Sequence, residues 1–211
     1  VIGSPDIDIM MSPSLPTISK VKQRYEIPFD KYGILIYHPV TTEYEEIGQK
    51  IKAVVDAVIR SNKNFVVIYP NCDLGTEIIL NEYKRLNKNN HFKLFPSLRF
   101  EYFLTLLKNS EFMIGNSSAG IRETSIYGIP SIDIGTRQSG RYKISTPTNI
   151  QHVDEKLEDI LEAINNIQKF RIKNMFFGEG NSTKLFMKIM EDENLWKQPI
   201  QKRFIDMEIQ V

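Results

Sequence analysis

Several features that would point to a particular class of protein are missing from this chain of 211 residues. It has a single cysteine, Cys72, which excludes an internal disulfide and is typical of a reducing compartment, so we expect a cytoplasmic location. One cysteine and three scattered histidines also exclude a Cys/His zinc cluster. No apolar run reaches 18 residues, so no segment is expected to span a membrane.

Charge of one sign is not in excess either. The chain has 27 basic and 26 acidic residues and a formal net charge of +1. Nucleic-acid binding or attachment to an anionic membrane would favour a clear basic excess. We therefore expect neither, and any anionic ligand has to be held by local groups.

The N-terminus, "VIGSPDIDIM", has no initiator methionine and no signal-peptide pattern. We interpret the chain as a piece of a longer protein.

Three common motifs are absent. There is no G-x-x-x-x-G-K-[ST] phosphate loop, and no G-x-G-x-x-G follows the first expected strand. The serine-hydrolase elbow G-x-S-x-G is missed because Gly115 and Gly120 are spaced wrongly around the two serines between them. The usual phosphate-loop, dinucleotide and serine-hydrolase interpretations therefore lack support.

What the chain does have is a regular alternation of apolar runs and helical stripes from residue 33 onward. Short apolar runs predict strands, and apolar residues at helical spacing predict helices between them. This alternation predicts an α/β fold with a doubly wound, parallel, Rossmann-like sheet over residues 33–190. Residues 1–32 contain Pro5, Pro13, Pro16 and Pro28, which we interpret as breakers, and predict a linker with one short helix near 18–25. Residues 191–211 predict a C-terminal tail. The expected strands are 33–37, 65–69, 91–95, 112–115 and 130–135, and the expected helices are 43–60, 76–86, 99–110, 119–128, 155–170 and 183–190.

Polar residues follow the expected strands at the points where those strands end. In such folds ligands bind beyond the carboxyl ends of the strands, so these residues are expected at one edge of one sheet. Clustering of polar residues is weak by itself because strand ends are usually polar. The residues concerned are His38, Asn71, Ser117, Ser118, Arg137 and Arg141.

The stretch "GNSSAGIRE" at 115–123 has the composition of a phosphate cradle. Ser117 and Ser118 offer hydroxyls where a helix is expected to begin, and Gly120 would let an anion approach backbone N–H groups. The commoner alternative is that one serine simply caps the helix. Glu123 would repel a phosphate but could accept hydrogen bonds from ribose hydroxyls. It could equally compensate the helix dipole or pair with Arg122.

Two further residues are candidates for contacts with an anion. Arg137 lies in a glycine-flanked loop and could bind phosphate in a bidentate manner, or it could be a solvated loop charge. His38, followed by Pro39, could carry a proton or contact phosphate, although a lone histidine is more often structural. Asn71 could contact a ligand or cap the helix that follows it.

With these residues in view, the chain resembles the second half of a UDP-N-acetylglucosamine 2-epimerase of the hydrolysing branch. The non-hydrolysing branch typically has Asp-Ser-Gly-Gly where this chain has residues 116–120, and His-Arg-Arg-Glu-Asn where this chain has "HPVTT". Both departures favour the hydrolysing branch. Four stretches carry the resemblance: "HPVTTEY" at 38–44, "PNCDLGTE" at 70–77, "MIGNSSAGIRETSIYGIPSIDIGTRQSGR" at 113–141, and "FFGEGNST" at 176–183.

The resemblance implies a two-domain fold of the GT-B type, in which this chain is the C-terminal, UDP-binding domain. It implies that Ser117 and Ser118 hold the diphosphate, that Glu123 holds the ribose, and that Leu98 contacts the uracil region through its backbone. Asn71 and Arg137 would complete the UDP site, and His38 would lie near the sugar and take part in catalysis. No metal or other cofactor is expected.

The implied reaction is elimination of UDP from a UDP-sugar, followed by addition of water with inversion at C2, giving a sugar for sialic-acid-type synthesis. The leaving diphosphate would be stabilised by Arg137 and a protonated His38. General acids and bases would come from an N-terminal domain of the same protein, and a homo-oligomer is possible. Two alternatives stay open: the nucleotide-binding half of a GT-B-type UDP-sugar glycosyltransferase, and a non-catalytic nucleotide-sugar module.

Overall fold

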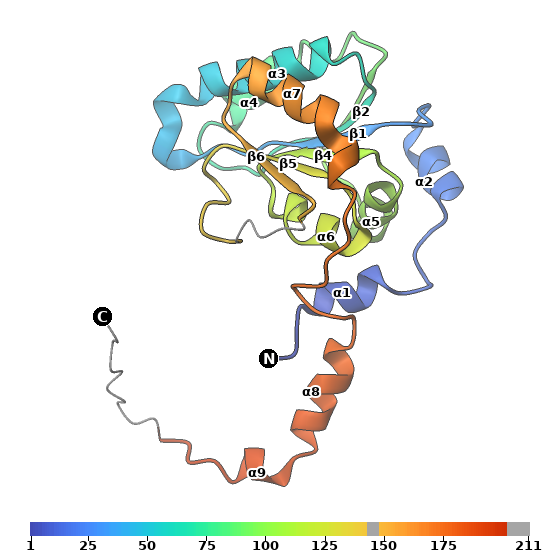
Figure 1. Cartoon of the computed structure of the whole chain (residues 1–211), viewed down its shortest axis with the longest axis vertical. Coiled ribbons are helices and arrows are strands. Elements are labelled where there is room, and N and C mark those ends of the chain that lie inside the picture. Colours follow the sequence, from blue (N-terminus) through green and yellow to red (C-terminus); the bar gives the residue numbers. More distant parts are fainter. Residues whose placement is uncertain (143–147, 202–211) are drawn as a thin grey trace.

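A computed structural model describes residues 1–142 and 148–201 and shows one parallel sheet between two layers of helices (Figure 1). The strand order is β3-β2-β1-β4-β5-β6, and all neighbours are parallel. This confirms the predicted parallel, Rossmann-like α/β fold. The strands are β1 Gly33–Ile36, β2 Phe65–Ile68, β3 Phe92–Phe95, β4 Phe112–Gly115, β5 Ser131–Ile134 and β6 Ile150–Val153.

The order of the strands reverses between β1 and β4. From β1 the sheet grows to β2 and β3 in one direction, and from β4 to β5 and β6 in the other. The loops that leave β1 and β4 therefore diverge to opposite sides of the sheet and leave a crevice at its carboxyl edge, where ligands bind in this class of fold.

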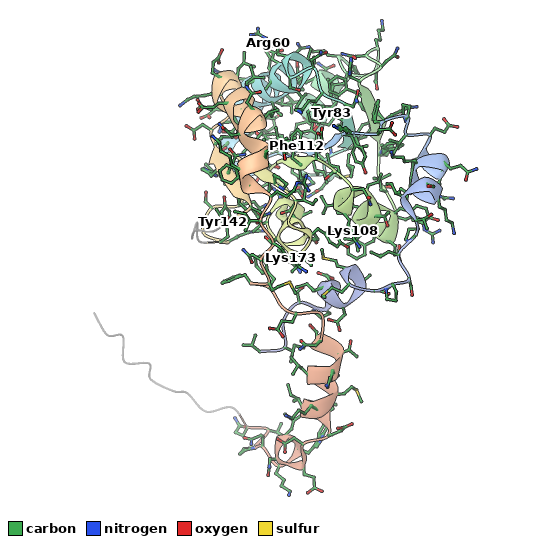
Figure 2. All side chains as sticks on the ribbon, turned by 45° about the vertical axis from the view of Figure 1, so that its right-hand side comes forward. Arg60, Tyr83, Lys108, Phe112, Tyr142 and Lys173 are labelled. Carbon is green, nitrogen blue, oxygen red and sulfur yellow. The ribbon has the colours of Figure 1, made fainter. Side chains whose placement is uncertain are left out.

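One face of the sheet is covered by α3 (Ile47–Arg60), α4 (Thr76–Tyr83) and α7 (Leu157–Asn166), seen at the top of Figure 1. In α3 the apolar residues recur every three or four positions, so one stripe faces the sheet and is fully buried. Phe112 and Tyr83, labelled in Figure 2, are fully buried on this side. Burial of the Phe112 side chain contributes about 1.5–3 kcal/mol.

The opposite face is covered by α2 (Ile18–Tyr25), α5 (Phe100–Lys108) and α6 (Glu123–Tyr127), together with α1 (Pro5–Met10). The predicted helix near 18–25 is confirmed as α2. The helix α1 was not expected because Pro5 was interpreted as a breaker, whereas proline is well tolerated in the first turn of a helix. The side chains of Ile7, Met10 and Val21 are buried, so α1 and α2 pack against the core on this face of the sheet.

The chain leaves the sheet after α7 through a short 3-10 helix, Ile167–Phe170, and ends in α8 (Ser182–Met190) and α9 (Glu193–Trp196). Asp8 of α1 holds the start of α8 by accepting hydrogen bonds from the N–H groups of Ser182 (3.0 Å) and Thr183 (2.9 Å). The helices α8 and α9 otherwise extend away from the sheet, and α9 occupies part of the predicted tail (Figure 1). The stretch "RFIDMEIQV" at its end lies outside the described residues.

The strand β6 was missed by the sequence analysis. It is an edge strand, and only Ile150 of its four residues is buried, so it lacks the apolar run that marks the inner strands. Within the described residues, no helix has the length and apolar character needed to cross a membrane.

Candidate functional site

Asn116 joins the carboxyl ends of the two central strands. Gly115 ends β4 with a φ of 129° so close to β1 that a Cβ there would collide with the carbonyl of Ile36, which explains the glycine. Asn116, fully buried, then accepts a hydrogen bond from the N–H of His38 (2.7 Å) and donates one to its carbonyl (2.8 Å). These paired bonds fix the backbone of His38 at the crevice.

The imidazole of His38 is buried and neutral. Its Nδ1 accepts a hydrogen bond from the N–H of Asn71 (3.1 Å), so the ring proton is on Nε2. Burial, followed by the positive charge of Arg137, lowers the pKa of His38 to about 4. At this pKa the ring is neutral at pH 7 and offers an N–H donor. Protonation of His38 beside a bound diphosphate stays a prediction.

Beside His38 lies a cavity of about 410 Å³ at the carboxyl ends of β1, β2 and β3. It brings together four of the predicted site residues, His38, Asn71, Leu98 and Ser117. Its remaining walls are mostly apolar, with Tyr69 and Phe100 among them, a combination typical of small-ligand sites. The exposed Cys72 follows Asn71 in the same loop. The lining is completed by Ile36, Ile68, Pro70, Pro96, Ser97, Phe103 and Ala119.

The two serines follow β4 in different roles. The hydroxyl of Ser117 accepts a hydrogen bond from the N–H of Ala119 (3.4 Å), so Ser117 is a cap and also lines the cavity. Ser118 begins a 3-10 turn, Ser118–Gly120, and α6 starts only at Glu123. The single helix expected over 119–128 is thus a turn followed by a short helix.

Gly120 is explained by packing. A Cβ at this position would lie 2.8 Å from the hydroxyl oxygen of Ser131 on β5, so the glycine lets the turn approach the sheet closely. This reason differs from the one given by the sequence analysis, in which the glycine exposes backbone N–H groups to an anion.

Glu123 carries an unused acceptor. Its Oε2 is buried without a hydrogen-bond partner among the described residues, and burial raises the pKa of the carboxyl. Arg122 does not form the alternative ion pair with Glu123, because its guanidinium donates to Asp6 (2.6 Å) and Ser4 (2.6 Å). A buried oxygen without a partner is costly unless a ligand hydroxyl or water reaches it.

Arg137 approaches the same crevice from the loop after β5. Its Nη1 donates to the carbonyl of Asn116 at 3.2 Å, and its charge is close enough to His38 to lower the pKa of the imidazole. Arg137 does not line the 410 Å³ cavity. It lines a second, polar one of about 430 Å³ with Asp73, Thr136 and residues 39–42. The two cavities share the loops that follow β1 and β2.

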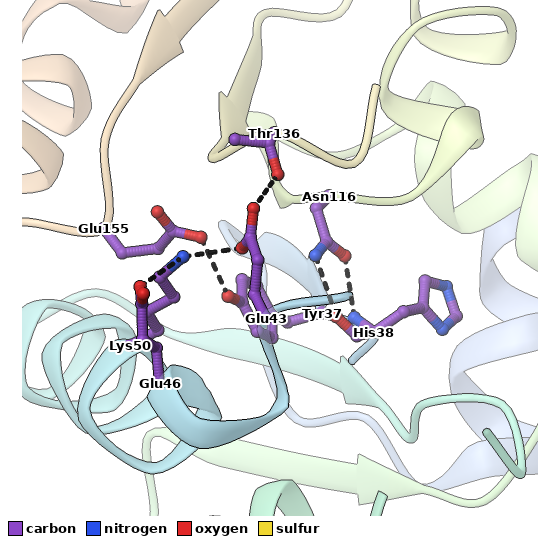
Figure 3. Close-up of polar contacts among 8 residues, drawn as sticks. All are labelled: Tyr37, His38, Glu43, Glu46, Lys50, Asn116, Thr136 and Glu155. Carbon is purple, nitrogen blue, oxygen red and sulfur yellow. Dashed lines mark hydrogen bonds and ion pairs between the residues drawn. The ribbon is translucent and has the colours of Figure 1, made fainter. Parts of the chain in front are cut away.

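The residues that hold these loops together were not among the predicted site residues. Gln138, fully buried, donates to the carbonyl of Asn116 (2.8 Å) beside Arg137. Glu43 and Thr136 join the loops after β1 and β5 by a hydrogen bond (Figure 3). These loop residues carry no local sequence pattern that predicts their role, because their hydrogen-bond partners lie 22 and 93 positions away in the chain. Within residues 1–142 and 148–201, no group of three His, Cys, Asp or Glu residues is arranged to hold a metal ion.

Comparisons with known proteins identify the family of the chain. The sequence profile of a family described as UDP-N-acetylglucosamine 2-epimerase matches residues 1–191. The chain is 44% identical to a UDP-N-acetylglucosamine 2-epimerase of Neisseria meningitidis over 99% of this chain and 56% of that protein. It is 28% identical to a hydrolysing UDP-N,N'-diacetylbacillosamine 2-epimerase of Legionella pneumophila over 95% of this chain and 53% of that protein.

Solved structures show the same fold. A UDP-GlcNAc 2-epimerase of Methanocaldococcus jannaschii, in complex with UDP-GlcNAc and UDP, superposes with a TM-score of 0.70 at 20% identity, over 90% of this chain and 54% of that one. The chain thus spans about half the length of the relatives that it matches. The profile match over most of the chain and the 44% identity show that it belongs to the UDP-N-acetylglucosamine 2-epimerase family.

Proposed function

We propose that this chain is the UDP-binding half of a hydrolysing 2-epimerase that converts UDP-N-acetylglucosamine, or a close 2-acetamido analogue, into the free 2-epimer and UDP. One observation carries the proposal: His38, Asn71, Leu98 and Ser117, from four separate loops, surround one cavity at the point where the strand order reverses. The hydrolysing reaction is supported by the Legionella relative of that description. The single cysteine fits a cytoplasmic enzyme.

The proposed binding mode follows the chemistry of each group. The uracil would lie against the apolar walls of the cavity near Leu98. The carboxylate of Glu123 would accept hydrogen bonds from the ribose hydroxyls, which requires a shift that uncovers its buried Oε2, because Glu123 lines a separate small cavity against α1. The hydroxyls of Ser117 and Ser118 and the guanidinium of Arg137 would hold the diphosphate, with Gly120 keeping the turn close to the sheet.

The neutral His38 has a defined task in this mechanism. Elimination moves the C2 proton to a base and breaks the bond between C1 and the β-phosphate oxygen, which leaves with negative charge. The Nε2–H of His38 would donate a hydrogen bond to that oxygen, while Arg137 supplies the positive charge. Water then adds at C1, and a proton returns to the opposite face of C2.

The carboxylates that move these protons are expected in the preceding half that the relatives have and this chain lacks. We therefore propose that this chain binds UDP without turning over a substrate. Homo-oligomer formation stays a prediction.

Titration calorimetry with UDP tests the proposal on this chain. Wild type should bind, and Ser117→Ala should bind more weakly by about tenfold, the effect of losing one charge-assisted hydrogen bond. Ser139→Ala in the loop after β5 is a matched control that should bind like wild type. Equal binding by wild type and Ser117→Ala, or no binding by either, would contradict the site. For the longer protein, NMR should identify a free 2-epimer from UDP-N-acetylglucosamine in water.

A further inference from the structure

Glu43 links the two loops that carry His38 and Arg137. It lies five residues after His38, in a short 3-10 helix, Thr41–Glu46. One carboxylate oxygen accepts a hydrogen bond from the hydroxyl of Thr136 (2.5 Å), the residue before Arg137. The other accepts from Nζ of Lys50 on α3 (2.6 Å), as Figure 3 shows. Both oxygens of the Glu43 carboxylate thus accept hydrogen bonds, one from each of two different elements.

The link is anchored on helix α3, which packs against the sheet. Lys50 also pairs with Glu46 at 3.0 Å, and the side chains of Lys50 and Glu43 are only 18% and 21% exposed. The hydrogen bonds from Lys50 and then Thr136 lower the pKa of Glu43, so the carboxylate is ionised at neutral pH. Partly buried charges in a shared network are held more firmly than a single surface pair.

The loop after β5 is restrained where it leaves the strand. Gly135 has a φ of 70°, and the carboxylate of Glu155 packs so closely that a Cβ on Gly135 would collide with it. Glu155 is itself held by the hydroxyl of Tyr37 at 3.1 Å. The next residue, Thr136, is held by Glu43, and only then does Arg137 reach the carbonyl of Asn116.

From these contacts we propose that Glu43 is a positioning residue that holds the Arg137 loop in register with His38, so that both groups reach one diphosphate. The inference rests on the proposed function, because the diphosphate is the ligand that the two groups share. Glu43 would contact no substrate atom itself. Its effect on binding would pass through Thr136 to Arg137.

The experiment compares Glu43→Ala with Glu46→Ala by titration calorimetry of this chain with UDP. Both changes remove a carboxylate partner of Lys50, but only Glu43 bonds Thr136, so Glu46→Ala is a matched control. We expect Glu43→Ala to weaken UDP binding about 5- to 20-fold and Glu46→Ala to change it less than twofold. Thr136→Val, which breaks the same link from the other side, should match Glu43→Ala.

An Arg137→Ala background separates positioning from general loss of structure. If Glu43 acts through Arg137, adding Glu43→Ala to Arg137→Ala should weaken UDP binding no further. A second loss of the same factor, or UDP binding by Glu43→Ala equal to wild type, would overturn the inference. Failure of wild type to bind UDP would instead reject the proposed function, and this inference with it.

Discussion

Replacing Asn116 with aspartate changes one donor in the middle of the site and almost no volume. The new carboxyl keeps an acceptor for the N–H of His38 but no longer donates to its carbonyl. Leaving that carbonyl without a partner costs about 1–3 kcal/mol. The new carboxylate also faces the carbonyl oxygen of His38 at a fully buried position, which raises the total loss in stability to about 3–5 kcal/mol. A loss of 3 kcal/mol corresponds to a fall of roughly 6–12 °C in Tm for a chain of this size.

The loss from Asn116→Asp should depend on pH, and the sign follows from linkage. Burial beside a carbonyl raises the native pKa of the new carboxyl above its unfolded value of about 3.9, so the native state binds more protons. The loss in free energy of unfolding relative to wild type is then largest above the native pKa. It becomes smaller as pH falls, because the protonated carboxyl can again donate a hydrogen bond to the carbonyl of His38. Asn116→Ala, which has no titrating group there, should keep a constant deficit. Urea unfolding at pH 5 and pH 8 measures both.

A deficit below about 1 kcal/mol for Asn116→Asp, or a deficit equal at both pH values, would refute the reasoning. Either result would mean that the paired bonds to His38 are not what holds the crevice together.

Three further predictions follow from single contacts. Because the native pKa of His38 is about 4 against about 6.5 in the unfolded chain, the unfolded state binds more protons between these values, so stability should fall by up to about 3 kcal/mol as pH drops through them. His38→Gln should remove that part of the urea-unfolding profile, and an unchanged profile would contradict it. Gly120→Ala should cost about 1–3 kcal/mol in thermal unfolding because its Cβ meets the Ser131 hydroxyl, and adding Ser131→Ala should restore part of the loss. Asp8→Asn should speed hydrogen exchange at the start of α8, including Ser182, without changing exchange in the sheet; unaltered protection there would exclude the cap.

The sequence revealed those parts of the fold whose signal is local. The strand β1 is buried on all four residues and reads as an apolar run, and α3 shows a clear stripe, so both were predicted. The edge strand β6 exposes part of its surface and carries no such run, and α1 begins with the proline that suggested a breaker. Local sequence patterns therefore do not predict elements at the margin of the core, such as β6 and α1.

The site residues also divide into those that local sequence patterns predict and those that they do not. His38 and Ser117 could be found because the carboxyl end of a parallel strand is a position that the sequence predicts. The protonation state of His38 could not, because it depends on burial and on a backbone N–H 33 positions away. Asn116 and Glu43 were missed because their importance lies in which loops they join, and strand order decides that.

Cys72 has a practical consequence for measuring this site. It is exposed, it is the single thiol of the chain, and it adjoins Asn71, whose N–H holds the imidazole. A maleimide fluorophore would therefore attach at one known place, next to the cavity-lining Asn71, without any engineered cysteine. Its emission and its quenching by iodide would report nucleotide occupancy directly, and blocking of alkylation by a bound nucleotide would give an independent reading of the same event.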